Sequence, residues 1–123
     1  GILALYAAAR GCPQIEACDI ELASVQAAQE LLPSARLHLG GPETMAPCDG
    51  VVANMTGAEL RAAMPAILRL WTRRHVLVLS GMRAHEVEVV TGMVPLPIAH
   101  REVVGDFTSV GYRGSDGGAG AVR

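Results

Sequence analysis

Asp19 is the first residue whose type and position could bind a ligand. It follows a short strand-like segment at residues 14–18, which itself follows an Ala- and Leu-rich helix that starts at Gly1. In dinucleotide-binding folds, an acidic residue roughly 20 positions past the glycine-rich turn accepts hydrogen bonds from the ribose diol. The two carboxylate oxygens suit the two hydroxyl groups, and the next residue, Ile20, could pack on the adenine face. The alternative is an ordinary solvated aspartate in a turn.

Asn54 is the second candidate. It closes the apolar run Val51-Val52-Ala53, which we interpret as a buried parallel strand. Its side-chain amide can accept a hydrogen bond from a substrate amine, as can neighbouring backbone carbonyls. An asparagine at this position could equally serve as a helix N-cap or form an Asx turn. Spacing alone leaves both interpretations open.

Other reactive residue types do not form a recognisable site. Ser80 follows an apolar run but lacks a GxSxG elbow, so we do not expect a hydrolase nucleophile. His85-Glu86 is not followed by the second histidine of a zinc-binding helix. The three cysteines show no CxxC spacing and are odd in number. We therefore expect neither a metal site nor a disulfide framework.

Signals for helices and strands alternate along the chain. Apolar residues at helical spacing, with Gly or Pro as stop signals, predict helices at residues 2–10, 21–32, 60–71 and 83–91. Short apolar or alternating runs predict strands at residues 14–18, 35–39, 51–53, 76–79, 98–104 and 107–112. Pro65 should kink the third helix or split it in two. Gly105-Asp106 predicts an antiparallel hairpin between the last two strands.

This alternation predicts an α/β fold, a Rossmann-like three-layer α/β/α sheet that is mostly parallel and ends in an antiparallel hairpin. Ligands of such sheets bind at the carboxyl ends of the strands, near the switch in strand order. Asp19, Asn54 and Ser80 all follow predicted strands, so we expect them at that edge.

Composition excludes several classes of function. The chain has 123 residues, of which 50% are hydrophobic and 18% charged, and this suits one globular domain with an aliphatic core. A net charge of -2 gives no basic face for nucleic acid, and no apolar run is long enough to span a bilayer. We expect a cytoplasmic protein with no direct nucleic-acid partner and no membrane partner.

Four segments occur in an order that resembles a known family: residues 1–5 (GILAL), 18–21 (CDIE), 49–55 (DGVVANM) and 77–82 (LVLSGM). Together they resemble the catalytic domain of the class I S-adenosylmethionine-dependent methyltransferases that modify a protein of the large ribosomal subunit (the PrmA type). The resemblance covers about residues 1–112, and the VVAN and LSG segments are its most specific parts.

The resemblance implies a seven-stranded sheet and S-adenosylmethionine as the cofactor. It implies that Gly1 and Asp19 contact this cofactor, and Ile20, next to Asp19, stays the candidate for the adenine face. Family members often place an acidic or polar residue against the adenine amine, and in residues 40–43 the candidate for this contact is Glu43. Asn54 would lie where the methyl group meets the acceptor nitrogen, as both the catalytic candidate and a cofactor contact. The implied acceptor is a protein amine, with a ribosomal protein as the first guess, and no metal is needed.

The family's first strand and most of its glycine-rich loop would precede Gly1, so we expect this strand to be missing. The expected organisation is a partial methyltransferase domain at residues 1–113 and a flexible Gly-rich tail at residues 114–123. Two other functions stay open. One is a methyltransferase that acts on a small molecule or on another protein. The other is a non-catalytic module that folds without binding the cofactor.

Overall fold

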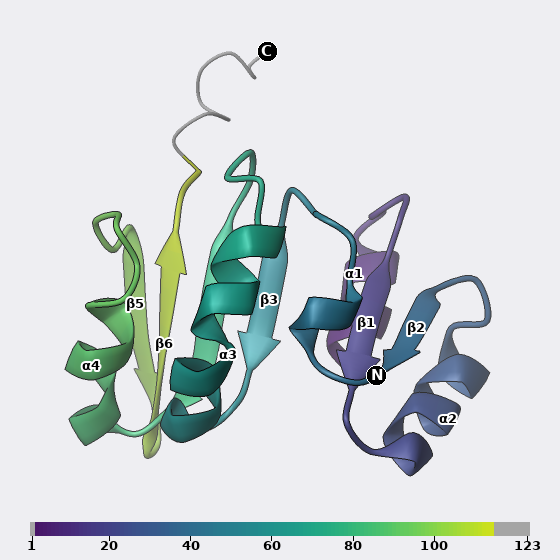
Figure 1. Ribbon diagram of the computed structural model, residues 1–123, viewed down its shortest axis with the longest axis horizontal. Coiled ribbons are helices and arrows are strands. Elements are labelled where there is room, and N and C mark those ends of the chain that lie inside the picture. The colour runs from purple at the N-terminus through teal and green to yellow at the C-terminus, as the bar shows by residue number, and fades with distance from the viewer. Residues whose placement is uncertain (1, 115–123) are drawn as a thin grey trace. The chain divides into compact units, whose positions relative to one another are not determined.

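The computed structural model describes residues 2–114 and divides the chain into two compact units, Gly1–Ala46 and Pro47–Arg123 (Figure 1). Gly1 and residues 115–123, which make up most of the predicted tail, lie outside the described residues.

The smaller unit contains two parallel strands and the helix that connects them. Its elements are α1 (Ile2–Ala9), β1 (Glu16–Asp19), α2 (Leu22–Leu31), β2 (Arg36–Leu39) and the 3-10 turn η1 (Pro42–Thr44). The two strands pair along their whole length, with Asp19 opposite Leu39 at the carboxyl end. Gly11 follows α1 with a φ of +86°, in agreement with the predicted helix stop.

Leu22, Val25, Ala28 and Leu32 lie at helical spacing and predict the buried stripe of α2, but the structure buries only part of it. Ala28 is buried and Val25 is half-buried, but Leu22 is 56% exposed and Leu32 lies beyond the end of the helix. The two strands of this unit are four residues long, whereas α2 has ten residues. A pair of short strands therefore covers the middle of the helix and leaves its first turn exposed.

The larger unit contains a four-stranded sheet in the order β3-β4-β6-β5. Its elements are β3 (Val51–Asn54), α3 (Gly57–Leu70), β4 (Leu77–Met82), the 3-10 turn η2 (Ala84–Glu86), α4 (Val87–Thr91), β5 (His100–Val104) and β6 (Phe107–Tyr112). β3 and β4 are parallel, whereas β6 is antiparallel to β4 and to β5. The predicted C-terminal hairpin is therefore confirmed.

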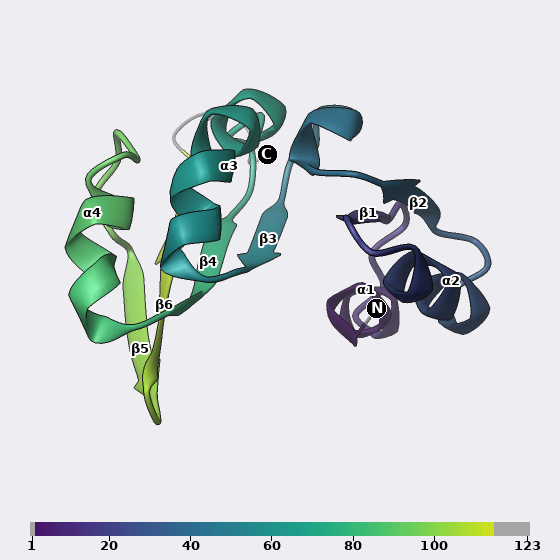
Figure 2. The ribbon, with the colours of Figure 1, turned by 60° about the horizontal axis from the view of Figure 1, so that its bottom comes forward.

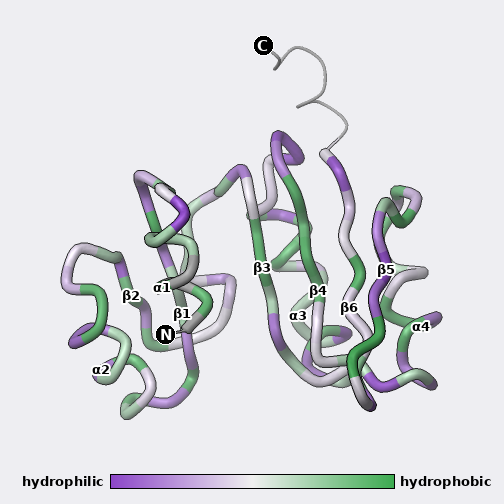
Figure 3. The backbone as a smooth tube through the Cα atoms, turned by 180° about the vertical axis from the view of Figure 1, so that it is seen from behind, coloured by the Kyte–Doolittle hydropathy of each residue, from purple (hydrophilic) through white to green (hydrophobic). Residues whose placement is uncertain are grey.

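Both helices of the larger unit lie on one side of its sheet (Figure 2). Between helices and sheet lies one aliphatic core, in which the hydrophobic residues of β4 are central (Figure 3). Its fully buried aliphatic members are Leu60, Met64, Ile67, Leu77, Leu79, Met82, Val87, Val90 and Val110. Because helices cover one face only, β3 is less buried than predicted: Ala53 is buried, but Val52 is 53% exposed.

A capping box starts α3. The Thr56 hydroxyl accepts a hydrogen bond from the Glu59 backbone at 3.2 Å, and the Glu59 carboxylate accepts one from the Thr56 backbone at 3.0 Å. The helix then continues without interruption through Pro65, so the predicted split is wrong. The proline lies on the exposed face, and the core contacts of Leu60, Met64 and Ile67 hold both halves of the helix to the sheet.

None of the helices within residues 2–114 is long and apolar enough to cross a membrane.

We expect Val90→Ala in α4 to lower the free energy of unfolding by about 2 kcal/mol, because it removes buried methyl groups and leaves a cavity. Val90 is 0% exposed, whereas its neighbour Val89 is 51% exposed. Val89→Ala is the matched control, with the same change in helix propensity and an expected effect within about 0.5 kcal/mol. Urea denaturation measures both values. Equal losses would contradict the described packing of α4.

Candidate functional site

Asp19 is the last residue of β1, not the residue after it, and its side chain is exposed. One carboxylate oxygen, Oδ1, accepts a hydrogen bond from the Glu21 backbone N–H at 2.9 Å. This bond is the local turn interaction that the sequence left open as an alternative. The second oxygen, Oδ2, has no hydrogen-bond partner among residues 2–114, so the carboxylate can still accept a hydrogen bond from a ligand.

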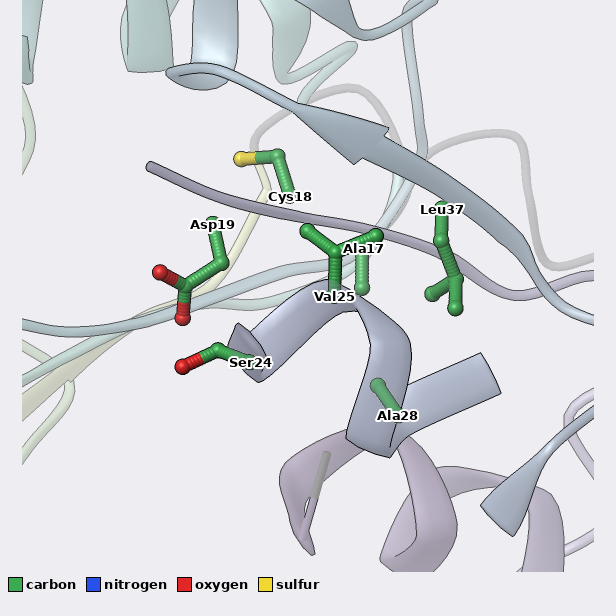
Figure 4. A pocket seen from close by; sticks show the side chains of 7 residues that line it. All are labelled: Ala17, Cys18, Asp19, Ser24, Val25, Ala28 and Leu37. Atoms are coloured by element: carbon green, nitrogen blue, oxygen red, sulfur yellow. The ribbon is translucent and has the colours of Figure 1, made fainter. Parts of the chain in front are cut away.

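A small cavity lies beside Asp19, within the smaller unit (Figure 4). Strand residues Ala17, Cys18, Asp19 and Leu37 line one wall, and Ser24, Val25 and Ala28 of α2 line the other. Asp19 and Ser24 present their oxygen atoms at one end of this cavity, whereas the remaining wall is mainly aliphatic (Figure 4). The Asp19 carboxylate thus stands at the border between an apolar wall and solvent.

Acidic side chains surround Cys18 on β1. Burial, followed by the carboxylates of Glu43, Asp19 and Glu16, raises the pKa of the Cys18 thiol above its usual value. For the Glu43 carboxylate to act on the thiol, Glu43 of η1 must lie near Cys18 of β1. The Glu43 carboxylate also accepts a hydrogen bond from the Gly41 backbone N–H at 3.2 Å. Ile20, next to Asp19, is 75% exposed and offers an apolar surface to a ligand.

The sequence did not indicate a second polar group of this unit, the pair Glu16 and His38. His38 Nε2 lies 3.1 Å from Glu16 Oε2, and the other Glu16 oxygen accepts a hydrogen bond from the Ala46 backbone N–H at 3.2 Å. Glu16 therefore connects both strands to the segment that follows η1. Glu16 and His38 are 22 positions apart in the sequence, so no local pattern indicates this contact.

Asn54 ends β3 and is exposed, as the strand prediction required. Its predicted alternative as a helix N-cap is wrong, because Thr56 caps α3 instead. The Asn54 amide oxygen, Oδ1, accepts a hydrogen bond from the Ser80 hydroxyl at 3.1 Å. Ser80 is the residue opposite Asn54 in the β3–β4 pairing, so the parallel register brings these two side chains together.

Gly81 approaches the same group from β4. Its φ is +96°, and a Cβ atom there would lie 2.9 Å from Asn54 Oδ1. The strand predicted to close before Ser80 in fact continues to Met82. The sequence placed Ser80 and Gly81 at the end of the predicted strand, whereas the strand carries them past Asn54.

Arg83 and Phe107 lie near this end of β4. The Arg83 guanidinium carbon is 5.1 Å from the centre of the Phe107 ring, within the range of a cation–π contact.

The predicted site residues fall into two groups, with Asp19, Ile20 and Glu43 in the smaller unit and Asn54 in the larger one. Gly1 lies outside the described residues. Within residues 2–114, no three His, Cys, Asp or Glu side chains are arranged to hold a metal ion.

Solved methyltransferase structures are similar to this fold. A ribosomal protein L11 methylase from Lactobacillus delbrueckii subsp. bulgaricus has a TM-score of 0.83 at 20% sequence identity, over 92% of this chain and 65% of that one. A TehB-like SAM-dependent methyltransferase from Corynebacterium glutamicum has a TM-score of 0.67 at 14% identity, over 92% of this chain and 74% of that one. The chain has a Rossmann-like methyltransferase fold.

At these identities the likeness concerns the fold, and the chain spans 65% of the length of the L11 methylase. No protein family and no curated protein matches the sequence. The methyltransferase fold agrees with the α/β class predicted from the sequence, including parallel pairing of β3 with β4 and an antiparallel pair at the C-terminal end of the sheet. In this fold, Asp19 and Asn54 each end a parallel strand.

We expect Gly81→Ala to destabilise the protein more than Gly105→Ala. Both glycines have positive φ, +96° and +61°, so both substitutions introduce backbone strain of roughly 1–2 kcal/mol. At Gly81 the added Cβ would also meet the Met55 carbonyl oxygen, whereas at Gly105 it would meet nothing within 4 Å. Thermal unfolding compares the two variants. Equal shifts in Tm would contradict the close approach of Gly81 to Met55.

Proposed function

We propose that this chain is an S-adenosylmethionine-dependent methyltransferase that methylates a protein amine. The likeness to the ribosomal protein L11 methylase, with a TM-score of 0.83 over 92% of the chain, is the observation that carries this proposal. Asp19 and Asn54 support it independently, because each is an exposed polar residue at the carboxyl end of a parallel strand. Ligands of Rossmann-like sheets bind at such ends.

The residues of the smaller unit suit the cofactor. The Asp19 carboxylate retains an oxygen for a ribose hydroxyl, and Ile20 offers an exposed apolar side chain to the adenine ring. Glu43 lies near β1 and can accept a hydrogen bond from the adenine amine. Residues 1–46 also carry five acidic and two basic side chains, a balance that favours a positively charged sulfonium compound. Gly1 is included as a backbone contact on the basis of the sequence resemblance alone.

When bound, S-adenosylmethionine supplies a methyl carbon that accepts the lone pair of the amine, while the electrons of the carbon–sulfur bond leave with sulfur. Asn54 contributes an amide oxygen that can accept an N–H of a neutral amine and so orient the nitrogen lone pair. A lysine side chain, with a usual pKa of about 10.4, must first lose a proton. The Asn54 amide does not titrate and cannot take this proton, so we expect the amine to lose it to water.

The acceptor that we would test first is ribosomal protein L11, because the similar solved structure is a methylase of that protein. A ribosomal acceptor would locate the reaction in the cytoplasm. Methylation of another protein or of a small molecule would keep the cofactor site and change only the acceptor.

We expect the chain to bind S-adenosylmethionine and S-adenosylhomocysteine, and we expect Asp19→Ala to weaken this binding about 10- to 100-fold, the range for loss of a charge-assisted hydrogen bond. Glu21→Ala is the matched control, since it removes an exposed carboxylate two positions away. Isothermal titration calorimetry measures all three proteins. A folded wild-type chain without binding would identify a non-catalytic module, and equal losses in both variants would refute the specific role of Asp19.

In a second experiment, we expect Asn54→Ala to lower kcat for methyl transfer by about 100-fold while the affinity for S-adenosylhomocysteine changes little, because the amide acts on the acceptor. Transfer of isotope-labelled methyl groups to purified L11, followed by mass spectrometry, gives the rate and the modified residue. An unchanged kcat would remove Asn54 from the mechanism. Methylation of added small amines instead of L11 would redirect the proposal to a small-molecule acceptor.

A further inference from the structure

Strand β4 carries an irregularity at the point where it passes Asn54. Leu79 pairs with Val110 of β6, but Met82 pairs with Thr108, so three steps along β4 correspond to two steps along β6. The extra residue is a β-bulge at Ser80 and Gly81. After the bulge, Met82 returns to the buried face and is 0% exposed.

The bulge requires an unusual backbone conformation. Gly81 has a φ of +96°, which residues other than glycine rarely adopt. A Cβ atom at this position would collide with the Met55 carbonyl oxygen and would lie 2.9 Å from Asn54 Oδ1. Strained conformations persist only where the surrounding structure fixes them, and they concentrate at functional sites.

Two groups of Ser80, where the bulge begins, bond to the end of β3. The Ser80 carbonyl oxygen accepts a hydrogen bond from the Met55 backbone N–H at 3.0 Å. The Ser80 hydroxyl donates to Asn54 Oδ1 at 3.1 Å. Backbone and side chain of one residue therefore fix both the chain after Asn54 and the Asn54 amide itself.

We propose that Ser80 is a positioning residue that holds the Asn54 amide in the position from which it meets the methyl acceptor. This inference rests on the proposed function. The terminal torsion of an asparagine side chain turns easily, so an amide without a partner would point in several directions. The Ser80 hydroxyl donates to Oδ1 at 3.1 Å and restricts this rotation, and Oδ1 keeps a second lone pair for an N–H of the acceptor amine.

Selective isotope labelling tests this proposal without measuring catalysis, because Asn54 is the only asparagine in the sequence. In protein labelled with 15N-asparagine, one pair of side-chain amide signals reports on Asn54 alone. We expect Ser80→Ala to move these signals toward the values of a free asparagine and to speed their exchange with water. Ser80→Thr keeps the hydroxyl and should retain the wild-type signals more closely.

Ser109→Ala in β6 is the control, since it removes a hydroxyl from a strand that does not pair with β3. The indole signal of Trp71, the single tryptophan and a buried residue, reports whether each variant is folded. Unchanged Asn54 signals in folded Ser80→Ala would overturn the proposal. A response of equal size to Ser109→Ala would also overturn it.

Catalysis adds a second readout. We expect Ser80→Ala to lower kcat for methyl transfer about 10-fold, with recovery in Ser80→Thr and an unchanged dissociation constant for S-adenosylhomocysteine. Weaker cofactor binding with unchanged kcat would overturn a role toward the acceptor. If the wild-type chain binds no cofactor, the proposed function fails, whereas the Asn54 signals still decide whether Ser80 fixes the amide.

Discussion

Parallel pairing of β3 with β4 is the constraint on which the candidate acceptor site depends. The register that sets Val51 opposite Leu77 also sets Asn54 opposite Ser80. Burial fixes this register, because Leu77 and Leu79 must face α3 and α4, and a shift by one residue would turn them to the open face. The aliphatic core thus determines which side chain of β4 meets Asn54.

Energetics separate the groups that hold the fold from the groups that prepare the site. Each fully buried leucine of the core contributes roughly 1.5–3 kcal/mol. The hydrogen bond from Ser80 to Asn54 lies near the surface and adds about 1 kcal/mol at most. This bond and the strained Gly81 are therefore poor explanations for stability. Their effect is on geometry, because they hold the Asn54 amide and the chain that follows β3 in place.

The smaller unit illustrates a different physical principle. Its candidate ligand residue, Asp19, is prepared by a short local bond to the Glu21 backbone, which leaves one carboxylate oxygen for a ligand. Around it, burial, followed by the carboxylates of Glu43 in η1 and of Asp19 and Glu16 on β1, raises the pKa of the Cys18 thiol. An excess of negative charge beside a partly apolar cavity favours a positively charged ligand.

The sequence by itself determined the alternation of helices and strands, the positions of Asp19 and Asn54 at strand ends, and the hairpin around Gly105, because periodicity and turn residues are local signals. Only the tertiary structure decided that Pro65 leaves α3 intact, that Thr56 rather than Asn54 caps it, and that β4 continues through Ser80 and Gly81. The partners of Asn54 and Glu16 lie 26 and 22 positions away. Strand register brings such residues together, and register is set by the packing of whole elements, which no local pattern contains.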